Sequence, residues 1–180
     1  MNQTVYLVRH CQAAGQEPDA PLTEEGDRQA VALAERLSHI TINRIISSPF
    51  LRARQSIQPL ANRLALTIEM DDRLIERVLS SAQHDDWRER LAQTFVDPDL
   101  SFEGGESSRA AMARGVAVVD DAIRHDATGT ILVTHGNLMT LILKHFDDQI
   151  GYSEWEKLTN PDVYCVKFNS GGAVVERLAQ

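Results

Sequence analysis

Several residues that could handle a phosphate group stand at, or shortly after, the ends of apolar runs in this sequence. They are Arg9, His10, Arg52, His135 and Gly136. Guanidinium groups match the oxygens of a phosphoryl group, and the free N–H groups of helix N-termini, expected after His135 and near Arg52, bind anions. A neutral imidazole supplies a lone pair that can attack phosphorus, and flanking arginines disfavour its protonated form. The pattern therefore predicts phosphoryl transfer with His10 as the acceptor.

Cys11 offers a second candidate nucleophile beside His10. Cysteine phosphatases place an arginine six residues after the cysteine, where it closes the phosphate loop, but Glu17 stands at that position here. A carboxylate there would repel both a thiolate and a phosphate. We therefore interpret Cys11 as a small buried residue beside the site.

The elements that must position these residues alternate between apolar runs and segments of helical period, which is typical of an α/β layer fold. Short apolar runs suit strands that are covered on both faces. The expected strands are 5–8, 44–47, 66–70, 130–134, 163–168 and 173–178. In an open α/β sheet, ligands bind beyond the carboxyl ends of the strands. We therefore expect the two histidines and two arginines to converge at one edge of the sheet.

Apolar residues at helical spacing predict helices between these strands. The stretches that carry them are 30–37, 53–64, 112–123 and 137–146. Thr23 can cap the first helix. Another helix is expected to begin near Ser48-Pro49, and Pro59 inside it predicts a kink or a break. The stretch 71–105 shows no strand alternation and is expected to cover one end of the sheet.

Length and composition predict one globular domain, 1–180, with 43% apolar and 24% charged residues. The net charge of −8 and the pI of about 5.2 disfavour nucleic acid and anionic membranes as partners, because binding to phosphodiester backbones needs a basic face. No apolar stretch approaches the ~20 residues of a membrane span and no signal-peptide pattern opens the chain, so we expect a cytoplasmic protein. Cys11 and Cys165 alone make no disulfide framework and no paired-cysteine metal motif.

Six motifs, taken in order, add up to a family resemblance. They are LVRH (7–10), PLTEEGDRQA (21–30), SSPFLRARQS (47–56), RLIE (73–76), GGES (104–107) and VTHG (133–136). The sequence resembles the histidine phosphatase superfamily, which includes the cofactor-dependent phosphoglycerate mutases, from residue 5 to about 145. The resemblance implies a three-layer α/β/α sandwich with a mostly parallel six-stranded sheet. Its order would be third, second, fourth, first, fifth, sixth, with the fifth strand antiparallel, so that strands one and four lie side by side.

The resemblance also implies a role for each matching residue. The expected catalytic residues are His10, Glu76 and His135, and the expected phosphate-binding residues are Arg9, Arg52, Gln16 and Gly136. His10 would be the phosphorylated nucleophile and Glu76 the proton donor to the leaving oxygen. No metal or other cofactor is required by this scheme, because the arginines supply the positive charge.

Two residues depart from the family pattern. Cys11 stands where a small residue, most often glycine, follows the nucleophile, and a side chain there is unfavourable if the backbone takes a positive φ. Gln16 replaces an asparagine that contacts phosphate in many members, and its side chain is longer.

Some assignments compete with plainer interpretations. Arg54 also lies in the RAR stretch, although the motif register favours Arg52. Acidic neighbours of Glu76 in the sequence make a solvated acidic face an alternative for that residue. The loop that carries His84 is a candidate to close over the pocket, and Trp87 to anchor it or to pack in the core.

The short chain favours hydrolysis over mutase chemistry, because the mutases it resembles carry more material over the site and exclude water. We predict a phosphatase that acts on a small phosphorylated metabolite and forms a phosphohistidine intermediate. The alternatives are phosphoryl transfer of the phosphoglycerate mutase type and a non-catalytic module that binds a phosphorylated ligand. A Rossmann domain and a serine hydrolase are disfavoured, since neither GxGxxG nor GxSxG is present. The oligomeric state and the identity of the substrate stay open.

Overall fold

A six-stranded sheet with the order β3-β2-β4-β1-β5-β6 forms the centre of the computed structural model, which describes residues 3–125 and 128–178. The ends of the expected domain 1–180 lie outside the described residues. The strands are β1 (Gln3–Arg9), β2 (Arg44–Ser47), β3 (Ile68–Met70), β4 (Gly129–Thr134), β5 (Asp162–Asn169) and β6 (Gly172–Arg177). β5 runs antiparallel to both of its neighbours, and the pairs among β1, β2, β3 and β4 are parallel. The predicted strand order and orientation are confirmed.

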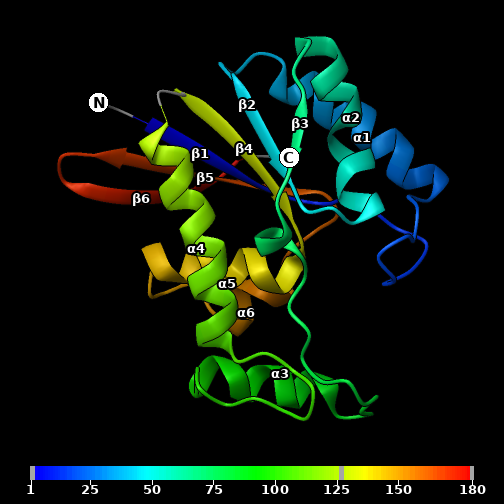
Figure 1. Cartoon of the computed structure of the whole chain (residues 1–180), viewed down its shortest axis with the longest axis vertical. Helices are drawn as coiled ribbons and strands as arrows, with labels where there is room; N and C mark the ends of the chain where they lie inside the picture. The colour runs from blue at the N-terminus through cyan, green and yellow to red at the C-terminus, as the bar shows by residue number, and fades with distance from the viewer. Residues whose placement is uncertain (1–2, 126–127, 179–180) are drawn as a thin grey trace.

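Helices cover both faces of the sheet and make the three-layer sandwich (Figure 1). The helices are α1 (Glu24–Leu37), α2 (Leu51–Leu64), α3 (Trp87–Val96), α4 (Ser108–Arg124), α5 (Gly136–Phe146) and α6 (Tyr152–Glu156), with a 3-10 turn at Asp72–Leu74. One buried cluster joins α1 and α2 to one face of the sheet, and a second joins α4 and α5 to the other face. Alternate residues of β1 divide between the clusters: Val5 and Leu7 belong to one and Val8 to the other.

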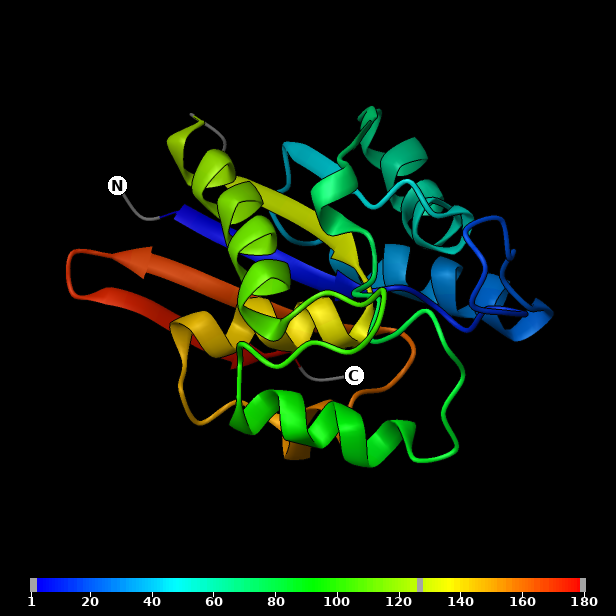
Figure 2. The ribbon, with the colours of Figure 1, turned by 60° about the horizontal axis from the view of Figure 1, so that its bottom comes forward.

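The stretch 71–105 lies at one end of the molecule, as expected. α3 packs against α6 there, apart from the two helical layers (Figure 2). The GGES motif and the residue before it secure this stretch, because the backbone N–H of Ser81 donates to the Glu103 carbonyl and that of Glu106 donates to the Val78 carbonyl. A Cβ on Gly105 would lie 2.1 Å from the Leu79 oxygen, so only glycine fits this close approach.

Two sequence expectations about α2, Pro49 in its first turn and a break at Pro59, are wrong. The helix begins at Leu51 with Phe50 as its N-cap, so Pro49 lies before it and not in its first turn. The helix also runs on past Pro59 without a break. Ile57 and Leu60, on either side of the proline, are fully buried, and this packing outweighs the lost backbone hydrogen bond.

The remaining differences are small. The third strand is shorter than expected, Ile68–Met70 in place of 66–70.

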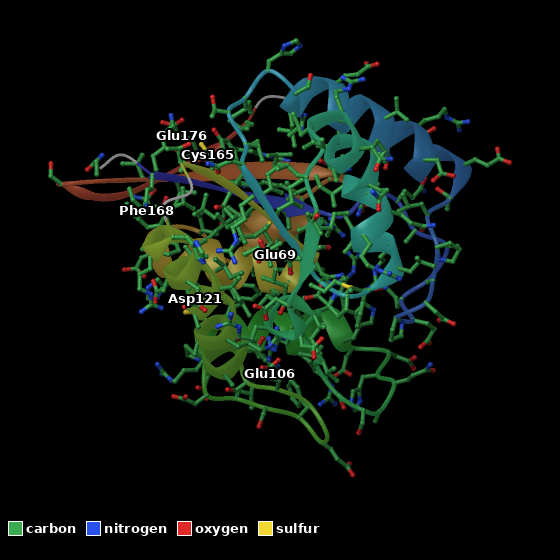
Figure 3. All side chains as sticks on the ribbon, turned by 45° about the horizontal axis from the view of Figure 1, so that its top comes forward. Glu69, Glu106, Asp121, Cys165, Phe168 and Glu176 are labelled. Atoms are coloured by element: carbon green, nitrogen blue, oxygen red, sulfur yellow. The ribbon has the colours of Figure 1, made fainter. Side chains whose placement is uncertain are left out.

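Cys165 is buried on β5, where it pairs with Glu176 of the neighbouring strand (Figure 3). Within residues 3–125 and 128–178, no helix is both long and apolar enough to cross a membrane.

Candidate active site

The carboxyl ends of β1 and β4 lie side by side and bring the two predicted histidines together. Arg9 and Thr134 are partners in the parallel register, and the backbone N–H of His10 donates to the Thr134 carbonyl at 3.1 Å. The rings of His10 and His135 stand edge to face with their centroids 5.1 Å apart. The predicted convergence of these two residues at one sheet edge is confirmed.

Two hydrogen bonds fix the protonation of the His10 ring. Nδ1 lies 2.7 Å from the Cys11 carbonyl oxygen, which can only accept, so Nδ1 carries the hydrogen. Nε2 accepts from Nε of Arg52 at 3.2 Å, and that nitrogen can only donate. In the neutral ring, the lone pair therefore lies on Nε2, beside a guanidinium.

Burial keeps His10 neutral. The residue is 8% exposed. Burial, helped by the charges of Arg52 and Arg9 and opposed by the bond to the Cys11 carbonyl, lowers the pKa of His10 to about 4. The imidazole is thus a free base at neutral pH.

His135 is wholly buried beside the first histidine. Its Nε2 lies 2.8 Å from the hydroxyl of Ser48, which follows β2, and its ring meets Phe50 edge to face. Burial above all, and then the neighbouring His10 and arginines, lowers the pKa of His135 well below its usual value. Nδ1 has no hydrogen-bond partner among the described residues.

Arg52 is the buried cation of the site, 1% exposed. Besides the bond from its Nε to His10, its Nη1 donates to the carbonyls of Gln16 at 3.1 Å and Glu17 at 2.8 Å. The guanidinium therefore ties the loop after β1 to the nucleophile. Burial lowers the pKa of Arg52, and the charge of Glu76 opposes this shift.

Arg9 is fixed from another direction. Its Nη1 donates to the carbonyls of Leu158 at 3.1 Å and Thr159 at 3.3 Å. A Cβ on Gly136 would lie 3.2 Å from Cζ of Arg9, so the glycine lets this guanidinium rest against the first turn of α5. Burial lowers the pKa of Arg9, opposed by the charges of Glu76 and Asp162.

The Glu76 carboxylate caps α5. Its Oε1 accepts from the backbone N–H groups of Arg77 at 2.9 Å and Leu138 at 3.0 Å, and its Oε2 accepts from that of Asn137 at 3.1 Å. A carboxylate at a helix N-terminus gains from the helix dipole. These bonds correct one expectation, because two of the N–H groups predicted to bind an anion after His135 are already occupied by Glu76.

The N-terminus of α2 needs the same correction. The backbone N–H of Phe50 donates to the Ser48 hydroxyl, and that of Leu51 donates to the Pro18 carbonyl. These two backbone N–H groups near Arg52 therefore already have protein partners. The positive charge available to an anion comes from the arginine side chains.

A cavity of about 660 Å³ opens beside these residues. Gln16, Glu76 and Gly136 line it together with Arg9. His10, Arg52 and His135 are almost wholly buried and are not among its lining residues; His10 adjoins the cavity through its neighbour Arg9. Gln16 is exposed at the rim. Further out, His84 and Trp87 line the same cavity; Trp87 is 42% exposed and is not a core residue.

Comparison with known proteins shows the family. The sequence profile described as "Histidine phosphatase superfamily (branch 1)" matches residues 5–180. The chain belongs to the histidine phosphatase superfamily. The match runs to the C-terminus, beyond the stretch from 5 to about 145 that carried the sequence resemblance.

Individual members of the superfamily differ in their named activities. A probable phosphoglycerate mutase, GpmB, of Salmonella choleraesuis is 30% identical over 150 residues, which are 73% of this chain and 69% of that protein. A mycobacterial glucosyl-3-phosphoglycerate phosphatase is 25% identical with a TM-score of 0.79, over 98% of this chain and 97% of the other. A phosphoserine phosphatase of Entamoeba histolytica, solved with phosphoserine, is 17% identical with a TM-score of 0.79, over 97% and 96% of the chains, which shows the fold alone.

Cys11 is unlike the nucleophile of a cysteine phosphatase. It is wholly buried, and burial raises the pKa of its thiol to about 11. Its backbone N–H donates to the Ser56 hydroxyl at 2.8 Å. Among the non-glycine residues described, only Ala65 has a positive φ, so the cysteine occupies its position without that strain.

Sequence reasoning missed two asparagines at this histidine phosphatase site. Asn160 donates from Nδ2 to the His10 carbonyl at 2.7 Å. Asn137 lines the cavity at the start of α5 and is 7% exposed. Its side-chain amide atoms, Oδ1 and Nδ2, have no hydrogen-bond partner within the described part of the chain. Asn137 directly follows the VTHG motif and could have been singled out, whereas no sequence signal links Asn160 to residue 10.

Proposed function

We propose that this protein hydrolyses phosphomonoesters of small metabolites through a phosphohistidine on His10. The observation that carries the proposal is the state of the His10 ring: Nδ1 is bonded to a carbonyl, and the lone pair on Nε2 stands beside the Arg52 guanidinium. A neutral imidazole held beside cations is the group that a phosphoryl acceptor requires.

The first step transfers the phosphoryl group to the enzyme. Arg52 Nε releases its hydrogen bond to Nε2 and turns to a phosphoryl oxygen. The freed Nε2 lone pair forms the N–P bond while the P–O ester bond breaks, and the leaving oxygen takes a proton from Glu76. Oε2 of Glu76, which accepts one N–H bond where Oε1 accepts two, is the oxygen with room for that proton. Arg9 and Arg52 balance the charge that spreads over the phosphoryl oxygens.

The second step returns the enzyme to its starting state. A water molecule attacks phosphorus, its proton passes to the Glu76 carboxylate, and the N–P bond breaks to leave neutral His10 and inorganic phosphate. His135 lies against the nucleophile, and burial lowers its pKa well below the usual value. Its hydrogen bond to Ser48 holds it in place.

Mutase chemistry is the second candidate, and the likeness to a named phosphoglycerate mutase favours it. The two reactions differ in the fate of the phosphoryl group, since a mutase returns it to another hydroxyl of the substrate. Exposed residues such as Gln16, Gln83 and Asp85 line the cavity, so water reaches it, which supports hydrolysis. Incubation with 3-phosphoglycerate separates the candidates: a phosphatase releases inorganic phosphate, and a mutase produces 2-phosphoglycerate.

A generic aryl phosphate assayed in excess EDTA tests the proposal. We expect turnover that survives the chelator, because the arginines supply the positive charge, and we expect His10→Ala to abolish it. Arg54→Ala is the matched control, since Arg54 stands two residues after Arg52 and is outside the site we describe. Full activity of His10→Ala, or loss of activity in EDTA that added metal restores, would contradict the proposal.

A further inference from the structure

The outer part of the catalytic cavity is built differently from the part that holds the arginines. It is lined by the loop 79–85, by the first turns of α3 and by α6, through residues that include Leu79, Gln83, Asp85, Trp87, Leu91 and Trp155. A cavity of about 660 Å³ has room for a whole small metabolite besides its phosphate. This outer wall therefore faces the leaving group.

The wall carries a supported aromatic surface. The rings of Trp87 and Trp155 stand edge to face, with centroids 5.9 Å apart and planes at 89°. Trp155 in turn stacks on Tyr152 at 5.4 Å. This support fixes Trp155, while Trp87 leaves 42% of its surface exposed at the cavity. Exposed aromatic surface beside a catalytic centre gains free energy when an apolar face covers it.

The charges at this wall are of both signs. Asp85 and His84 line it side by side. The Arg88 guanidinium lies over the Trp87 ring, 5.2 Å from its centroid. Charge alone therefore does not decide which leaving group fits this wall, and the exposed surface of Trp87 is its distinguishing feature.

Resting on the proposed function, we propose that this wall selects leaving groups that present an apolar face to Trp87. The preferred substrates are then monophosphates of ring-bearing alcohols. Trp87 is the specificity-determining residue and acts through contact.

Two alkyl phosphates test the contact. Ethyl phosphate and 2-phenylethyl phosphate have similar alkoxide leaving groups and differ in the ring. We expect kcat/KM about tenfold higher for the ring-bearing substrate, because the ring covers exposed Trp87 surface. Trp87→Ala should remove most of this preference, while Trp87→Phe keeps it. Val96→Ala is the control on α3, since Val96 is 87% exposed and does not line the cavity.

The outcomes separate this inference from the proposed function. Hydrolysis of ethyl phosphate that disappears in His10→Ala establishes the function. If the phenylethyl substrate is then no better, or if Trp87→Phe and Trp87→Ala lower both substrates equally, the inference is overturned while the function stands. If no phosphomonoester is hydrolysed, both are overturned.

Discussion

At the scale of single residues, the site divides its work between an imidazole and a carboxylate in different surroundings. His10 is almost wholly buried and has a pKa lowered to about 4, so it is a free base. Glu76 is half-buried and holds three backbone N–H groups through its two oxygens. A nucleophilic imidazole needs the buried environment that keeps it unprotonated. A carboxyl group that gives and then takes a proton must keep one oxygen within reach of the substrate.

Glu76→Gln tests the assignment of the acid. We expect a loss of about 10²–10⁴ in kcat on an alkyl phosphate, whose leaving alkoxide needs a proton. The loss should be much smaller on an aryl phosphate, because a phenolate leaves without one. Steady-state rates on the two substrates measure the difference. Equal losses on both would indicate that Glu76 acts only by capping α5, and unchanged turnover of the alkyl phosphate would contradict its role.

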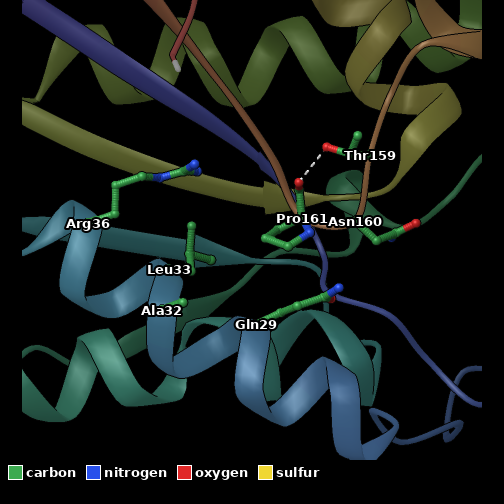
Figure 4. A pocket seen from close by; sticks show the side chains of 7 residues that line it. All are labelled: Gln29, Ala32, Leu33, Arg36, Thr159, Asn160 and Pro161. Carbon is green, nitrogen blue, oxygen red and sulfur yellow. Dashed lines mark hydrogen bonds between the residues drawn. The ribbon is translucent and has the colours of Figure 1, made fainter. Parts of the chain in front are cut away.

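At the scale of elements, the segment between α6 and β5 positions the nucleophile from outside the sequence motifs. It gives Arg9 its two carbonyl partners and gives His10 the Asn160 donor. The segment is anchored by the buried Asp162, which accepts from the Thr159 N–H and pairs with Arg177 of β6. Gln29 of α1 holds the loop that follows β1, because its side-chain oxygen accepts from the backbone N–H of Gln12. Figure 4 shows Gln29 and Asn160 on opposite walls of a small cavity of about 250 Å³.

Asn160→Ala tests this positioning role. Removal of its 2.7 Å bond to the His10 carbonyl frees the backbone that aims the imidazole, so we expect kcat to fall about tenfold. KM should change little, because Arg9 and Arg52 keep their own partners. Asn62→Ala, at an exposed position on α2, is the control. A rise in KM with kcat unchanged would indicate that Asn160 serves substrate binding and not the aim of His10.

Gly136→Ala tests the contact between α5 and Arg9. The added Cβ would lie 3.2 Å from Cζ and Nε of Arg9 and displace the guanidinium. We expect kcat/KM to fall about tenfold with little change in melting temperature. Gly151→Ala is the matched control, since nothing lies within 4 Å of its Cβ position. Equal activity of the two variants would show that the place of Arg9 does not depend on this glycine.

At the scale of the whole molecule, the apolar runs predicted the strands, and the family resemblance carried by the six motifs implied their order. The convergence of His10 and His135 follows from that order, since β1 and β4 are neighbours. The details that were missed depend on long-range packing. The continuation of α2 through Pro59 is decided by burial against α1, and the use of α5 N–H groups by Glu76 depends on where residues 73–76 cross the helix.

Two buried neutral histidines also make the stability of the fold depend on pH. The pKa values of His10 and His135 lie below that of an unfolded histidine, near 6.5, so the unfolded chain binds more protons in mildly acidic solution. The free energy of unfolding therefore falls as the pH drops from about 7 toward 4.

His10→Gln isolates the contribution of one ring. Urea titrations at pH 7 and pH 5 should show a wild-type loss of unfolding free energy that exceeds the variant's by about 2 kcal/mol. The difference between the two proteins removes the effect of carboxylates, which are common to both. The same loss in both proteins would contradict a lowered pKa for His10.

Direct detection of the phosphorylated residue tests the central claim. The enzyme is mixed with an excess of substrate, quenched within milliseconds in base, where phosphohistidine is stable, and digested for mass spectrometry. We predict one phosphoryl group on the peptide that contains His10, lost on brief acid treatment and absent from His10→Ala. Phosphate found on Cys11, or rapid turnover with no phosphorylated His10 at any quench time, would contradict the account.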